Sequence, residues 1–131
     1  MLQYARFALV LWTVVVAAAV DTGRWVRVHG GAWDPSPAIL SELETALKPA
    51  VTSAARNRGR LAPWSEYTFQ YQGRNSPLAR RFVYVNAFCR YEGGSLSKEW
   101  VQIDDGGACF FSAKYDPDKK LIYDVEVNCV G

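Results

Sequence analysis

Histidine is nearly absent from this chain of 131 residues, because His29 is the only one. A serine or cysteine nucleophile usually needs a histidine base, and zinc sites are usually built from histidine and cysteine at short spacing. No such partners surround His29, which stands beside Gly30 and Gly31. We therefore expect His29 to be a solvated loop residue, and we predict no catalytic residue, no metal site and no cofactor.

Recognisable catalytic motifs are also missing, since the chain contains no G-x-S-x-G, P-loop, H-E-x-x-H or C-x-x-C. The most distinctive polar cluster is Asp104-Asp105-Gly106-Gly107. A calcium loop spreads its ligands over about twelve residues, so we interpret this cluster as a turn between strand segments. Acid–base catalysis by two carboxylates that meet in space stays open, because spatial approach leaves no mark on the sequence.

Strong charge of either sign is lacking as well. Fifteen Lys and Arg stand against 13 Asp and Glu, for a net charge of +2. Nucleic-acid binding usually requires a strongly basic stripe, so we expect no nucleic-acid partner. Half of the residues are hydrophobic and 14% are aromatic, which is the composition of a folded domain. The length predicts a single domain.

The N-terminus resembles an export signal. Arg6 is the only charged residue in the first twenty, and the run 7–20 is uncharged. This run is short for a membrane span, which needs about 20 residues. The small residues Ala17-Ala18-Ala19 suit signal-peptidase cleavage. We predict a signal peptide over 1–19 and a periplasmic or secreted domain over 20–131, with a retained anchor or a core helix as alternatives.

A helix is predicted to begin after Ser36, which suits the N-cap, with Pro37 in the first helical position. Apolar residues then recur at spacings of three and four on one stripe: Ile39, Leu40, Leu43, Leu47, Val51 and Ala54. Pro49 lacks the N–H of a helical residue and clashes with the preceding turn. We therefore expect a kink or a break near Lys48.

Beyond Pro63 the apolar period falls from about 3.6 to two, which predicts strands. Four are expected, within residues 64–73, 80–91, 108–115 and 121–129, with a tight turn at Asp116-Pro117-Asp118. Residues 25–28 and 100–103 are compatible with further short strands. This order predicts an α+β fold, in which the kinked helix packs on a curved four-stranded antiparallel sheet.

Three cysteines, Cys89, Cys109 and Cys129, lie in the part predicted to be exported, where disulfides persist. If strands 80–91 and 108–115 pair about a midpoint near residue 99, Cys89 faces Cys109. Pairing of the last two strands about their turn places Cys109 opposite Val127 or Cys129. We favour a Cys89–Cys109 disulfide, and a Cys109–Cys129 bond or three free thiols remain alternatives.

The same pairing predicts which face of the sheet is buried. The residues expected on the core face, beside the cysteines, are Val83, Val85, Phe111, Leu121, Tyr123, Val125 and Val127. The opposite face carries the aromatic residues Phe82, Tyr84, Phe88 and Phe110. These need a cover, for which the candidates are residues 21–34, the loop 92–107, a dimer partner or a ligand.

The order of elements over residues 35–130 resembles the cystatin-like architecture, which includes cystatins and the cone-shaped NTF2-like proteins. Cystatins insert a Q-x-V-x-G loop and a Pro-Trp hairpin into a protease cleft. Here Gln70-Tyr71-Gln72-Gly73 is one residue short of the first motif, and no Trp follows Pro117. The runs YTFQYQG, FVYVNAFC and DDGGACFFSAKYD are similar to those of small exported bacterial proteins.

These patterns favour an exported, non-enzymatic binding module, with inhibition of a hydrolase as one form of that function. Its partner would be an unknown protein or small ligand in the envelope or outside the cell. One alternative is an NTF2-like enzyme or small-ligand binder that uses the concave face of the sheet. Another is a membrane-tethered accessory of the envelope, if residues 7–20 stay uncleaved.

Overall fold

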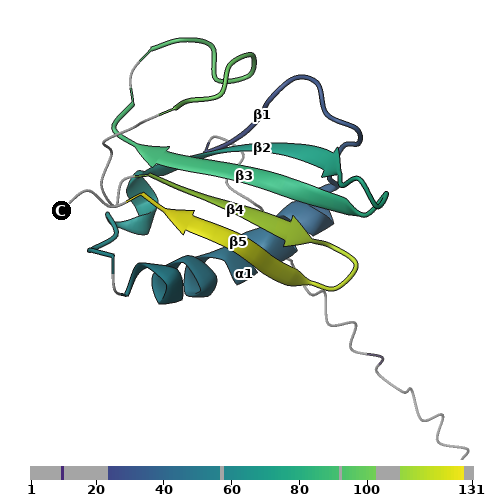
Figure 1. Ribbon diagram of the computed structural model, residues 1–131, viewed down its shortest axis with the longest axis horizontal. Helices are drawn as coiled ribbons and strands as arrows, with labels where there is room; N and C mark the ends of the chain where they lie inside the picture. The colour runs from purple at the N-terminus through teal and green to yellow at the C-terminus, as the bar shows by residue number, and fades with distance from the viewer. Residues whose placement is uncertain (1–9, 11–23, 57, 92, 103–109, 129–131) are drawn as a thin grey trace, which may run out of the picture.

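The computed structural model describes residues 10, 24–56, 58–91, 93–102 and 110–128. They form an α+β fold in which the helix α1 (Pro37–Ala55) packs on one face of a five-stranded mixed sheet (Figure 1). The Asp104-Asp105 cluster, Cys109, Cys129 and nearly all of the predicted signal peptide lie outside the described residues. Within the described part of the chain, no helix is long and apolar enough to span a membrane.

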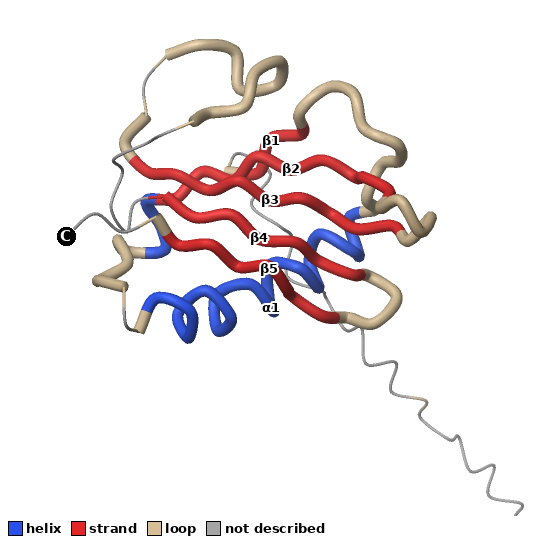
Figure 2. Tube along the Cα trace, viewed as in Figure 1, coloured by secondary structure: helices blue, strands red, loops and turns tan. Residues whose placement is uncertain are grey.

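The strands lie side by side in the order β1-β2-β3-β4-β5 (Figure 2). Their bounds are β1 Trp25–Arg27, β2 Tyr67–Asn75, β3 Arg81–Cys89, β4 Phe110–Asp116 and β5 Leu121–Val127. The strands β2 to β5 form the expected antiparallel series. The four-stranded prediction is incomplete because β1 adds a parallel fifth strand along β2. The three residues of β1 are too few to show the alternation of apolar and polar side chains by which a strand is recognised in a sequence.

The helix begins as predicted, because the Ser36 hydroxyl accepts a hydrogen bond from the Ile39 N–H at 3.2 Å. It then runs through Pro49 to Ala55 as one element, so the predicted break is wrong. Pro49 lies on the exposed side of the helix. The fully buried Leu47 and Val51 flank it, and their packing on the sheet holds the two halves together. A bend at this point stays a prediction.

The core lies between α1 and the sheet. The predicted stripe of the helix is buried at Leu40, Leu43, Leu47 and Val51, and it meets the odd-numbered residues of β3 and β4. Val83, Val85, Phe111 and Val127 are buried there as expected, and Val125 is partly buried against the same cluster. At the β1 edge of the sheet, Trp25 of β1 stacks on Phe69 of β2 with 4.4 Å between ring centroids.

Two residues assigned to the core face lie on the opposite face. The β4–β5 register shifts between Ser112 and Lys114, so that Lys114 pairs with Tyr123 and Asp116 with Leu121. One extra residue in a strand reverses the alternation of its side chains, which a sequence pattern of period two does not anticipate. The prediction for Leu121 and Tyr123 was therefore wrong, and Ile122 packs against the core instead.

The chain between β1 and α1 turns back along β2. Gly30 and Gly31 adopt φ values of 92° and 88°, which side chains rarely tolerate. Trp33 then forms an isolated antiparallel bridge with Gly73, and its indole N–H donates to the Arg74 carbonyl at 3.0 Å. The approach is so close that a Cβ on Gly73 would lie 2.2 Å from the Trp33 carbonyl oxygen.

Candidate ligand site on the sheet face opposite the helix

A row of polar side chains crosses the sheet on the face that α1 does not cover. Gln70, Asn86, Ser112 and Glu126 stand directly opposite one another on β2, β3, β4 and β5. The first three are buried, with at most 9% of each residue exposed, and Glu126 is exposed. Sequence reasoning placed aromatic residues on this face and missed the row. The sequence signal for the row is a polar residue inside each of the four strands. These residues can be recognised as neighbours only when the strand register is known.

Gln70 attaches the segment after β3 to this face. Its amide nitrogen donates to the carbonyls of Leu96 and Glu99, at 2.8 and 2.7 Å. Its amide oxygen accepts from the Val101 N–H at 2.9 Å and from Asn86 Nδ2 at 3.1 Å. All four hydrogen bonds that a glutamine amide commonly makes are thus satisfied inside the protein.

Asn86 completes the attachment, because its Nδ2 also donates to the Val101 carbonyl at 2.8 Å. Val101 therefore both donates to and accepts from the polar row, and it is 5% exposed. Residues 96–101 consequently cover the β2 and β3 part of this face. The loop 92–107 was one of four candidate covers for this face, and its described residues 96–101 bond to the row at β2 and β3.

An aromatic and cationic wall stands beside the row. Trp100 meets Tyr84 edge to face, with 5.2 Å between ring centroids. The guanidinium of Arg74 lies 4.3 Å from the centroid of Tyr84 and 5.1 Å from that of Trp100. Arg74 is further oriented by a 2.9 Å hydrogen bond from its Nε to Gln72 Oε1. The three groups of the wall therefore hold one another in place.

The wall and the β4–β5 end of the row line a cavity of about 560 Å³, here called the sheet-face pocket. Its described lining residues are Arg74, Tyr84, Asn86, Trp100, Val101, Gln102, Phe110, Ser112, Glu126 and Asn128. Arg74 and Glu126 are the charged residues among them, so this lining is neutral overall. Aromatic rings with a few convergent amide, hydroxyl and charged groups are typical of small-molecule sites.

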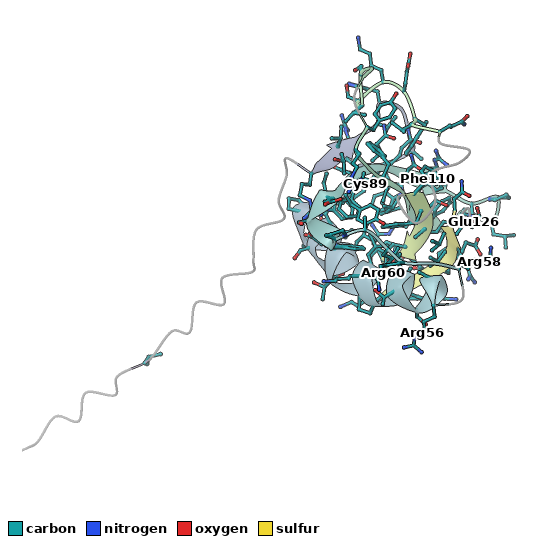
Figure 3. All side chains as sticks on the ribbon, turned by 90° about the vertical axis from the view of Figure 1, so that its left-hand side faces the viewer. Arg56, Arg58, Arg60, Cys89, Phe110 and Glu126 are labelled. Carbon is teal, nitrogen blue, oxygen red and sulfur yellow. The ribbon has the colours of Figure 1, made fainter. Side chains whose placement is uncertain are left out.

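A second hollow of about 480 Å³ adjoins the sheet-face pocket and shares Phe110, Glu126 and Asn128 with it. It extends past the edge strand β5 to Arg58, beyond the end of α1. Figure 3 shows Phe110, Glu126 and Arg58 on the same side of the molecule. The sheet-face pocket is thus open toward β5.

The aromatic residues predicted on this face take different roles. Phe88 is 2% exposed and contacts Tyr91, with 5.5 Å between centroids. Phe82 lies beneath the Lys114 ammonium, which is 5.6 Å from its ring centroid. Tyr84 and the partly buried Phe110 line the pocket. The predicted recognition surface is therefore smaller than expected.

The remaining predicted site residues lie apart from the pocket lining. His29 is exposed after β1, as predicted, and its backbone N–H donates to the Ser97 carbonyl at 2.7 Å. Cys89 is buried at the end of β3. The β3–β4 register pairs Phe88 with Phe110, as the disulfide prediction assumed. Because Cys109 lies outside the described residues, the disulfide stays a prediction.

The described residues form neither a metal-binding cluster nor a projecting loop of the cystatin kind. Among residues 24–56, 58–91, 93–102 and 110–128, no three His, Cys, Asp or Glu side chains gather as a metal ion would need. The counterpart of the cystatin loop, Gln70 to Gly73, lies within β2 between two neighbouring strands. In this position it does not project from the sheet as a loop would.

No protein-family model matches the chain, and no curated protein or solved structure shows significant similarity to it.

Proposed function

We propose that this protein is an exported, non-enzymatic binding module whose ligand occupies the sheet-face pocket. The observation that carries the proposal is the wall of Trp100, Tyr84 and Arg74 beside the open end of the polar row. A site of this kind offers flat apolar contact on one side and directed hydrogen bonds on the other. A compact ligand with a ring and several hydroxyl or amide groups would use both.

The described lining also favours an uncharged ligand. Arg74 is occupied by two aromatic faces and by Gln72. Asn86 already bonds to Gln70 and Val101. These contacts fix the shape of the pocket before any ligand arrives, which lowers the entropic cost of binding. Ser112 and Glu126 stand next to each other at the open end, where they would bond to ligand hydroxyls. We therefore propose a neutral saccharide of one or two rings.

The export and disulfide predictions belong to this proposal. Residues 1–19 support export by their pattern, and the observed β3–β4 register supports a Cys89–Cys109 bond. A cystatin-like arrangement is supported by one helix followed by four antiparallel strands. Hydrolase inhibition is supported by element order alone, so we rank it below ligand binding in the pocket as a proposed function.

The proposal is tested by titrating the purified protein with a panel of neutral mono- and disaccharides and following backbone amide NMR shifts. We expect one of them to shift the amides around Trp100 and Ser112, and Trp100→Ala to weaken its binding about tenfold or more. The matched control is Tyr91→Ala, an exposed aromatic outside the pocket lining, which should bind normally.

Two outcomes would reject the proposal. If no saccharide shifts the pocket amides, the ligand class is wrong. If Tyr91→Ala and Trp100→Ala weaken binding equally, the location is wrong. The enzymatic alternative is tested in the same samples, because a binding module returns its ligand unchanged. If the wild type converts the saccharide and the Glu126→Gln variant does not, the enzymatic alternative is favoured.

A further inference from the structure

A second candidate site lies at the C-terminal end of α1. The chain has no Asp or Glu between Glu44 and Glu66, and that stretch carries Lys48, Arg56, Arg58 and Arg60. All four cations are exposed. None of them takes part in a salt bridge among the described residues. On a chain with a net charge of only +2, this is a local concentration of unpaired positive charge.

Lys48, Arg56 and Arg60 border a hollow of about 380 Å³, here called the basic groove, whereas Arg58 lines the hollow beside β5. Its described lining residues are Lys48, Thr52, Ala55, Arg56, Gly59, Arg60, Leu61, Ala62 and Trp64. Leu61, Ala62 and Trp64 are partly buried and form an apolar floor beside Ala55. Figure 3 shows the three arginines around the end of α1, with Arg56 extending into solvent. Positive charge and recessed apolar surface thus occur together.

The apolar floor is held firmly by the core. Trp64 stacks on Phe111 with 5.7 Å between centroids, and the Arg24 guanidinium donates to the Trp64 carbonyl. The Ala62 N–H donates to the Tyr67 hydroxyl at 3.3 Å. A floor fixed in this way loses little conformational entropy when a partner covers it.

Stabilisation of the helix accounts for only part of the charge. Cations near a helix C-terminus interact favourably with its dipole, and this explains Arg56 at the C-cap. The effect falls off within the last turn. Lys48 lies about two turns earlier, and Arg60 lies beyond the helix, so neither is explained by it. Nor does helix capping call for a recessed apolar floor.

We propose that the basic groove binds an acidic segment of a partner protein, with one apolar side chain on the floor between flanking carboxylates. Arginine binds carboxylates through paired hydrogen bonds, and Arg56 and Arg60 are positioned on the rim to do so. A membrane surface fits less well, because it needs protruding apolar side chains. The large exposed hydrophobic residues of the described chain, Val10, Leu78, Tyr91 and Leu121, lie outside this groove.

The proposal is tested by selecting a display library of short random peptides on the purified full-length protein. We expect enrichment of peptides in which Asp or Glu flanks one large apolar residue. Their affinity, measured by fluorescence polarisation, should fall about tenfold or more in the double variant Arg56→Gln/Arg60→Gln. The matched control is Arg80→Gln/Lys119→Gln, which removes the same charge from two exposed turns and should bind normally.

The control distinguishes a specific site from general electrostatic attraction, because it removes the same charge away from the groove. Lys119, for example, lies beside Lys120, which pairs with Glu42 near the opposite end of α1. Equal weakening in both double variants would overturn the proposal. So would enrichment without acidic residues, or no enrichment at all. If no peptide is enriched and phosphatidylglycerol vesicles bind in a manner that depends on Arg56 and Arg60, the partner of the groove is a membrane surface and not a protein. Saccharide binding in the sheet-face pocket should be unchanged in every variant, so the two sites are judged separately.

Discussion

Gln70 of β2 and Asn86 of β3 lie directly opposite each other, and Asn86 Nδ2 donates to Gln70 Oε1 at 3.1 Å. Both amides also bond to the main chain of residues 96–101. The pair therefore joins the sheet to the segment that carries Trp100. A buried amide network of this kind is costly to leave half satisfied, and so it specifies one position for the segment.

Replacing Gln70 by Leu should destabilise the protein by about 2–4 kcal/mol, because several buried polar groups lose their partner at once. The free energy of unfolding in urea measures this loss. The control Gln102→Leu changes an exposed residue and should stay within about 0.5 kcal/mol of the wild type. A Gln70→Leu protein as stable as the wild type would contradict the structural role of the network.

Replacing Gly73 by Ala should destabilise the protein by about 3 kcal/mol, since the added Cβ meets rigid backbone. The nearest atom is the Trp33 carbonyl oxygen at 2.2 Å. The control Gly94→Ala has only the Tyr91 hydroxyl near the new Cβ, at 3.8 Å, and a φ of 64° in the left-handed helical region, so only backbone strain of about 1 kcal/mol is expected. Chemical denaturation compares the two, and equal losses would show that the Trp33 contact is unimportant.

The Cys89–Cys109 prediction is tested by mass spectrometry of peptides from a non-reducing digest. Cys89→Ala and Cys109→Ala should each lower stability in oxidising buffer by about 2–4 kcal/mol. Cys129→Ala should have no such effect. A loss in Cys109→Ala and Cys129→Ala, with Cys89→Ala unchanged, would instead favour the Cys109–Cys129 alternative.

Alkaline pH should destabilise the protein partly through Tyr115. Burial raises the pKa of this phenol above its ordinary value of 10.0, and Glu42 and Asp116 raise it further. A pKa raised in the folded state favours the protonated phenol there. Its contribution is therefore fully present below about pH 10 and is lost as the pH rises through that value toward the folded pKa.

The comparison with Tyr115→Phe isolates this effect. The variant loses the Tyr115 hydrogen bond to Glu42, so it should be about 1 kcal/mol less stable than the wild type at neutral pH. Above pH 10 the difference should shrink, as measured by urea unfolding at a series of pH values. The exposed Tyr91→Phe serves as the control and should follow the wild type throughout. A constant difference between Tyr115→Phe and the wild type would contradict the prediction.

Local chemistry explains which parts of the fold were predictable. Ser36 and the apolar stripe from Leu40 to Val51 determine a helix and its buried face, because capping and spacing act over a few residues. The Asp116 carboxylate accepts from the N–H groups of Asp118 and Lys119, which forms the predicted turn. Pro49 misled the prediction because the packing of its neighbours outweighs one lost hydrogen bond.

The sheet-face pocket was not predictable in the same way. Tyr84 and Phe110 were expected on that face, but nothing in the sequence relates Arg74 to Trp100. Such contacts depend on the strand register and on the path of residues 96–101. The basic residues at the end of α1 were visible, whereas the apolar floor beneath them came from the return of the chain at Leu61 and Trp64.

The sequence by itself determined an α+β chain with one amphipathic helix, four alternating strands and their turns, since these follow from short-range periodicity and capping. Only the tertiary structure decided that β1 joins the sheet in parallel, that a register shift turns Leu121 and Tyr123 away from the core, and that a polar row anchors a segment distant in the chain. The physical reason is that these features depend on packing and hydrogen bonding between residues far apart in sequence, which a local sequence pattern does not report.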